Sequence, residues 1–165
     1  MHKNIDKLNK SWILAGGALF FAVVVLVKYQ MPPPHVLLHS TGCYERLPPL
    51  WLLGLLWYGS YALMGCALGH ILSLRHISCD GNGSRYLGAF LLLAGAVLGI
   101  VWYMLLFGKQ VVLLSWLLKS IELALLFGSV YVWIRVSKIA VIFTVIALFV
   151  HVLLWITQLF VMLHI

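Results

Sequence analysis

The sequence predicts an all-α membrane protein, a single domain built as an antiparallel bundle of five transmembrane helices. The 165 residues are 64% hydrophobic, with a mean hydropathy of +1.07. Only 9% are charged, whereas about a quarter of the residues in a soluble domain carry charge. The apolar residues form five runs, each long enough to cross a hydrocarbon core of about 30 Å. Short links between consecutive runs require neighbouring helices to run antiparallel.

The polar links divide the domain, residues 1–165, into its spans. The Pro48–Pro49 pair opens the second span, because proline suits a first helical turn but not a helix interior. The segment around Asp80–Gly83 contains D-G and N-G and predicts a loop. Gly108, Lys109 and Gln110 make a tight third link. We therefore expect the helices at about 12–28, 49–74, 86–107, 111–134 and 139–163.

Basic residues give the chain a net charge of +7. They flank the spans, so we expect them at the membrane surfaces and expect no nucleic-acid partner. With the N-terminus inside, the inner side carries Lys3, Lys7, Lys10, Arg75, Arg85, Arg135 and Lys138, against Lys28, Arg46 and Lys109 outside. The positive-inside rule thus predicts a cytoplasmic N-terminus.

Two aromatic residues lie unusually deep in the second span. Trp57 and Tyr61 are four residues apart and therefore share one helix face. Lipid-facing helices usually keep Trp and Tyr at the interfaces. An indole N–H and a phenol O–H at mid-membrane depth need partners, so both rings should point into the bundle.

Three ionisable residues lie inside predicted spans, where such groups are functional candidates. His151 is near the middle of the fifth span. It is either a neutral imidazole bonded to another helix or a ligand contact, including an axial ligand to haem iron. Lys119 and Glu122 are three residues apart in the fourth span and can pair. They form either a structural pair or part of a proton or substrate pathway.

Small residues mark two helix faces for close packing. Gly88, Gly95 and Gly99 share a face of the third span and are the candidate seam of a homodimer. Gly65 and Gly69 form a second GxxxG motif. For each face the alternative is a contact within one chain.

Hydrolytic, nucleotide-binding and CxxC motifs do not occur in the sequence. The chain has four acidic residues, which argues against paired-carboxylate catalysis. The spacing of its cysteines suggests no metal motif, and His151 is a candidate for contact with a metal, as a haem ligand.

Two motifs carry a family resemblance. The pattern P-P-x-W-x-x-G-x-x-W-x-x-x-Y-x-x-M-G, from Pro48 to Gly65, closely resembles the second helix of the TspO/MBR proteins. These are the tryptophan-rich sensory proteins, related to the mitochondrial translocator protein. The segment Trp102–Gly108 resembles the family's W-x-x-x-F-F-G ending of helix three. The likeness extends over about 12–163, since the five-span plan also matches.

The resemblance implies a receptor-like or sensor-like protein of a bacterial cell membrane. The family binds porphyrins such as haem and protoporphyrin IX, or sterol-like and drug-like molecules, among its five helices; no cofactor is obligatory. By motif match, Trp51, Trp57, Tyr61 and Trp102 are the expected ligand-binding residues, and His151 joins them as a buried polar candidate. Some bacterial members degrade protoporphyrin in light with pocket tryptophans implicated, so Trp57 is the candidate catalytic residue.

The sequence departs from the family pattern at positions that bear on which function is expected. Gly99 stands where the family has Asn, and Val150 stands where it has a second pocket Trp, unless Trp155 serves instead. Ligand binding is therefore the leading expectation. The alternative is a small transporter or membrane scaffold subunit that uses Lys119, Glu122 and His151. The third reading is a light-dependent porphyrin-degrading enzyme.

Overall fold

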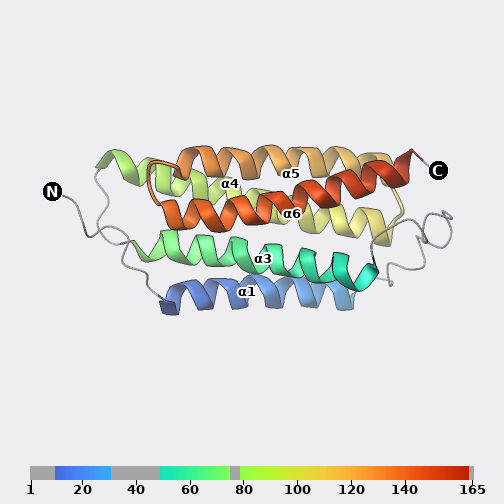
Figure 1. Cartoon of the computed structure of the whole chain (residues 1–165), viewed down its shortest axis with the longest axis horizontal. Helices are drawn as coiled ribbons and strands as arrows, with labels where there is room; N and C mark the ends of the chain where they lie inside the picture. Colours follow the sequence, from blue (N-terminus) through green and yellow to red (C-terminus); the bar gives the residue numbers. More distant parts are fainter. Residues whose placement is uncertain (1–9, 31–48, 75–78, 164–165) are drawn as a thin grey trace.

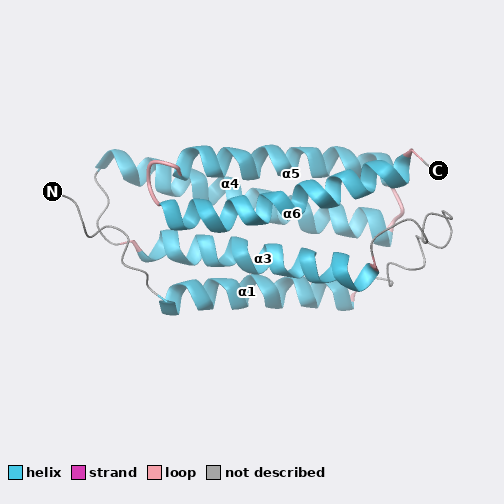
Figure 2. Cartoon of the chain, viewed as in Figure 1, coloured by secondary structure: helices cyan, strands magenta, loops and turns pink. Residues whose placement is uncertain are grey.

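The computed structural model is a bundle of long helices (Figure 1). It describes residues 10–30, 49–74 and 79–163. Those residues form helices joined by turns, without a strand (Figure 2). The elements are α1 (Lys10–Tyr29), α3 (Leu50–Ser73), α4 (Cys79–Tyr103), η2 (Met104–Gly108), α5 (Val112–Trp133) and α6 (Lys138–Met162).

Five of the described helices, with η2 continuing α4, are long and apolar enough to cross a membrane. Large apolar side chains cover the outside of the bundle, among them Leu14, Phe90, Phe127 and Phe149. Water would penalise so much exposed apolar surface, whereas acyl chains would not. Length, composition and this surface indicate a multi-pass membrane protein, as the sequence predicts.

The helices are not arranged in chain order (Figure 1). Helix α3 packs against both α1 and α6, and α5 packs against both α4 and α6. Helix α1 lies at the edge of the bundle, beside α3. The interior is therefore enclosed mainly by α3, α4, α5 and α6.

Helix α4 corrects one expected boundary, because it begins at Cys79 rather than near residue 86. The D-G and N-G pairs lie in its first turns instead of in a loop. Arg85 ties this part of α4 to α3, since its guanidinium donates to the Leu74 carbonyl at 2.8 Å and to the Leu72 carbonyl at 2.7 Å. These bonds hold this stretch of α4 against the end of α3 and give the last carbonyls of α3 a hydrogen-bond donor.

The tight link after the third span is confirmed, but the helix reaches it through a π-helical turn. The wider turn, η2, follows Tyr103 directly, and its last residue is Gly108. The Lys109 amide then donates to the Met104 carbonyl at 3.2 Å, and the Val111 amide to the Leu105 carbonyl at 3.0 Å. Such π-turns re-aim side chains and are frequent at functional sites.

Gln110 adopts a left-handed backbone conformation in this link, with φ 56°. A non-glycine residue in this conformation destabilises the folded state by about 1–2 kcal/mol. Replacing it with glycine removes this strain but also gives the unfolded chain more conformational freedom, which cancels part of the gain. Gln110→Gly is therefore expected to raise the free energy of unfolding by up to about 1 kcal/mol, measured by denaturation in one fixed detergent. A loss of stability would contradict this account of the link.

Glycines let α1 and α3 approach closely. A Cβ added at Gly16 would overlap the Gly65 carbonyl, and one at Gly69 would overlap the Trp12 carbonyl. The GxxxG motif of α3 is therefore a contact within the chain.

The glycine face of α4 also lies inside the bundle. A Cβ at Gly88 would overlap the Trp133 indole, and one at Gly95 would approach Leu126. Gly99 faces Tyr61 and Glu122. The seam expected for a homodimer is therefore occupied within one chain, and a homodimer would need another surface.

Candidate functional site

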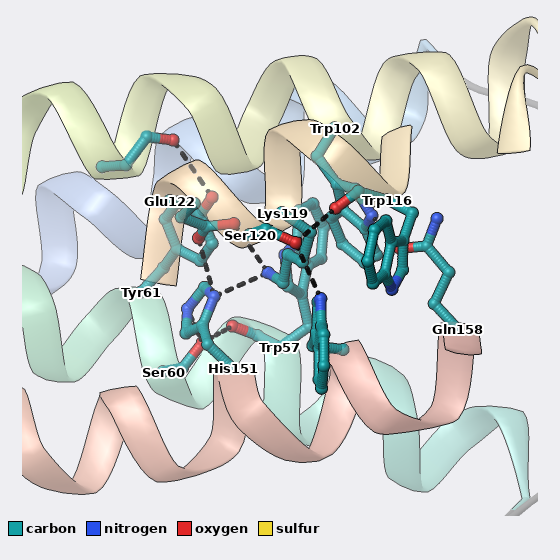
Figure 3. A network of polar contacts seen from close by, with 12 residues as sticks. Trp57, Ser60, Tyr61, Trp102, Trp116, Lys119, Ser120, Glu122, His151 and Gln158 are labelled. Carbon is teal, nitrogen blue, oxygen red and sulfur yellow. Dashed lines mark hydrogen bonds and ion pairs between the residues drawn. The ribbon is translucent and has the colours of Figure 1, made fainter. Parts of the chain in front are cut away.

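Three ionisable side chains meet in the interior of the bundle (Figure 3). Lys119 and Glu122 come from α5, and His151 comes from α6. All three side chains are 0% exposed. The Lys119 Nζ is 2.8 Å from Glu122 Oε2, and His151 Nδ1 is 2.7 Å from Glu122 Oε1. We call these three residues the charged cluster.

The Lys119 ammonium is fully surrounded by partners. Besides Glu122, its Nζ lies 2.7 Å from His151 Nδ1 and 4.1 Å from the centroid of the Trp102 ring. An ammonium has three N–H groups, and these three directions match a carboxylate, a ring nitrogen and an aromatic face. Pairing of this kind is what makes a charge tolerable at membrane depth.

Helix α3 brings a serine into contact with the charged cluster. His151 Nε2 lies 3.0 Å from Ser60 Oγ, and Ser60 Oγ donates to the Trp57 carbonyl at 2.7 Å. Both ring nitrogens of His151 are thus engaged. Axial ligation of haem iron by His151 would require the Ser60 contact or the Lys119 and Glu122 contacts to break.

Aromatic rings from α3, α4 and η2 line one side of the cluster. Trp57 stacks on Tyr103, with ring centroids 4.2 Å apart and planes 13° apart, and meets Tyr61 edge-on at 5.4 Å. Phe107 lies 4.7 Å from Tyr103. Tyr61 donates its hydroxyl to the Ala96 carbonyl at 3.1 Å. We call Trp57, Tyr61, Trp102, Tyr103 and Phe107 the aromatic wall.

Trp57 is the unusual member of the wall. Its side chain is only 3% exposed, yet its indole Nε1 makes no hydrogen bond of good geometry within the described chain. The polar group that it faces is the Tyr61 hydroxyl, which donates its hydrogen to the Ala96 carbonyl and can still accept through its oxygen. Buried indole N–H groups usually find an acceptor, and the Tyr61 oxygen is the acceptor within the chain that this one faces.

Trp102 links the cluster to a second polar network. Its indole Nε1 donates to Gln158 Oε1 at 2.6 Å. The Gln158 amide donates in turn to Ser115 Oγ at 2.7 Å and to the Val112 carbonyl at 3.2 Å. This network fixes the Trp102 ring, whose face then contacts Lys119.

The structure brings together most of the residues singled out from the sequence. Trp57, Tyr61, Trp102 and His151 converge with Lys119 and Glu122. Trp51 does not join them, because it lies in the first turn of α3 and is 70% exposed. Trp155 does not replace the absent family Trp in the aromatic wall, because it stacks on Trp116 at 5.6 Å and donates to Ser120 Oγ at 3.0 Å.

Sequence reasoning missed Ser60 and Tyr103. Ser60 lies three residues after Trp57, one helical turn away on the same side, so a search for polar residues on that face could have found it. Tyr103 adjoins Trp102, but its stacking on Trp57 depends on how α4 packs against α3. No local signal predicts that contact.

The described residues contain no group of three or more His, Cys, Asp or Glu side chains suited to a metal ion. The arrangement can instead hold charge and protons next to flat aromatic surfaces.

Comparison with models of known families, with curated proteins and with solved structures finds no match to this chain.

Proposed function

We propose that this chain is a receptor-like membrane protein of the TspO/MBR type that binds a flat, largely apolar ligand against the aromatic wall. Haem and protoporphyrin IX are the first ligands to test. The observation that carries the proposal is Trp57, a buried indole stacked face to face on Tyr103 within the aromatic wall. Flat aromatic faces with few polar groups suit a flat macrocycle.

A ligand would enter by replacing the ring contact between Trp57 and Tyr103. The two planes are nearly parallel, so a planar ligand can take the place of one ring without losing the stacking geometry of the other. An acceptor on the ligand, such as a carboxylate, would then replace the Tyr61 oxygen as the partner of the Trp57 N–H.

Titration of protoporphyrin IX into the full chain in nanodiscs, read by quenching of tryptophan fluorescence, tests this site. Trp57→Ala is expected to raise the Kd about tenfold, because the variant loses a stacking face and a hydrogen-bond donor, together worth about 1–2 kcal/mol. Trp12→Ala is the matched control, since Trp12 is 52% exposed on α1. Equal affinities for wild type and Trp57→Ala would exclude the aromatic wall as the binding site.

Illumination of the protoporphyrin complex separates binding from catalysis. Loss of pigment that needs Trp57 would support the light-dependent enzyme. If the pigment stays intact under illumination while it remains bound, the light-dependent enzyme is excluded and ligand binding is retained as the function.

The charged cluster favours a second function, that of a small transporter or a scaffold subunit. Ionisable groups buried in a membrane bundle commonly mark ion or proton pathways. Lys119, Glu122 and His151 provide three such groups from two helices. Substrate uptake into vesicles that requires a proton gradient and is abolished in Glu122→Gln would support transport. Uptake without gradient dependence would exclude this role for the cluster.

A further inference from the structure

One nitrogen in the charged cluster faces both a donor and an acceptor. His151 Nδ1 lies 2.7 Å from Lys119 Nζ and 2.7 Å from Glu122 Oε1. An ammonium can only donate, and a carboxylate can only accept. An imidazole nitrogen carries either a proton or a lone pair, so Nδ1 cannot satisfy both neighbours at once.

The other ring nitrogen has a fixed role. The Ser60 hydroxyl has one hydrogen, and it goes to the Trp57 carbonyl at 2.7 Å. Ser60 Oγ can then only accept from His151 Nε2, 3.0 Å away. While Ser60 donates to the Trp57 carbonyl, Nε2 carries a proton and only the proton at Nδ1 can change.

These contacts define two states that share the same heavy-atom positions. In the first, Lys119 is an ammonium and donates to the lone pair on His151 Nδ1. In the second, an N–H bond of Lys119 breaks and leaves its electron pair on Nζ. An N–H bond forms on Nδ1, and the resulting imidazolium donates to Glu122 Oε1. Each state contains one positive and one negative charge, so the transfer creates no unpaired charge in the membrane.

The side chains that α3 and α4 place against the charged cluster add no further charge to either of the two states. Helix α3 brings Tyr61, whose hydroxyl is donated to the Ala96 carbonyl. Helix α4 brings the uncharged face of Trp102 over Lys119 Nζ. A metal cation is a poor alternative to the proton, because Ca²⁺ or Mg²⁺ needs several oxygen ligands and the cluster offers one carboxylate that is already paired.

We propose that the charged cluster is a binding site for one transferable proton, shared between Lys119 Nζ and His151 Nδ1, with Ser60 as the positioning residue. The inference rests on the second function proposed above and names the two atoms that share its coupling proton.

Nitrogen NMR of the full chain in nanodiscs, with ¹⁵N-labelled histidine, tests the proposal; His151→Gln identifies the signals of this ring. In wild type, Nε2 is expected at the position of a protonated nitrogen. Nδ1 is expected between the protonated and unprotonated positions, moving with temperature as the two states exchange. A neutral ring protonated at Nδ1, or an Nδ1 signal fixed at either extreme, would overturn the proposal.

Two variants shift the balance in opposite directions. Lys119→Met leaves Glu122 facing His151, so both ring nitrogens should become protonated. Glu122→Gln leaves the Lys119 ammonium, so Nδ1 should become unprotonated. The wild-type measurement decides the question if either variant fails to fold.

The NMR readout needs no substrate, so it is independent of transport. Exchange at Nδ1 without proton-coupled uptake would exclude transport and keep the proton site. Uptake with a static Nδ1 would exclude the proton site and keep transport.

Discussion

Glu122→Gln is expected to lower the free energy of unfolding by about 3–5 kcal/mol, because it leaves a buried ammonium without its countercharge. Glutamine keeps the size of the side chain, so the loss would reflect charge rather than packing. Lys119 Nζ is 2.8 Å from the carboxylate, and both side chains are fully buried. Reversible unfolding in mixed micelles, at one fixed lipid composition, measures the change.

The matched control removes both charges. Lys119→Met combined with Glu122→Gln is expected to recover at least half of the lost stability, because no isolated charge then stays buried. A double variant less stable than Glu122→Gln alone would show that the ion pair does not dominate. A single-variant loss below about 1 kcal/mol, the value typical of an exposed pair, would contradict the burial of this cluster.

Gly99→Ala is expected to destabilise the bundle by about 1–3 kcal/mol, as overpacking of a tight interior does. A Cβ at this position would overlap the Tyr61 hydroxyl oxygen and Glu122 Oε1. Neither atom can retreat freely, since Tyr61 is bonded to the Ala96 carbonyl and Glu122 is paired with Lys119 and His151. The same unfolding measurement reports the effect.

Gly59→Ala serves as its control, because a Cβ there meets no heavy atom within 4 Å. Alanine is the better helix former by about 1 kcal/mol, so this variant should be as stable as wild type or more stable. Equal responses at Gly99 and Gly59 would mean that α4 does not approach the charged cluster as closely as the structure places it.

The five spans could be predicted from the sequence because hydropathy is a local property, averaged over about twenty residues. The exact ends could not. Near the start of α4, Arg85 reaches the carbonyls of Leu72 and Leu74. Those atoms are thirteen and eleven residues away in the chain, respectively, beyond any turn signal that the local sequence carries.

The site could be predicted in part, for a chemical reason. Lys119, Glu122 and His151 stand out because charge is rare and costly inside a membrane. Trp57 and Tyr61 stand out because their polar atoms need partners at that depth. Trp51 resembles Trp57 in sequence, but the two are six residues apart and so project from different faces of α3. Only the placement of α4 and α6 decides which face is the inside.

Apolar helices, and the polar side chains that need partners inside them, can be recognised from the sequence alone. The tertiary structure decided their partners: Ser60 and Lys119 for His151, Tyr103 for Trp57, and Gln158 for Trp102. Apolar character and helical phase are encoded residue by residue. Distances of a few ångströms between side chains of different helices depend on the packing of the whole bundle. Glycines such as Gly16, Gly65 and Gly99 let these helices approach one another closely.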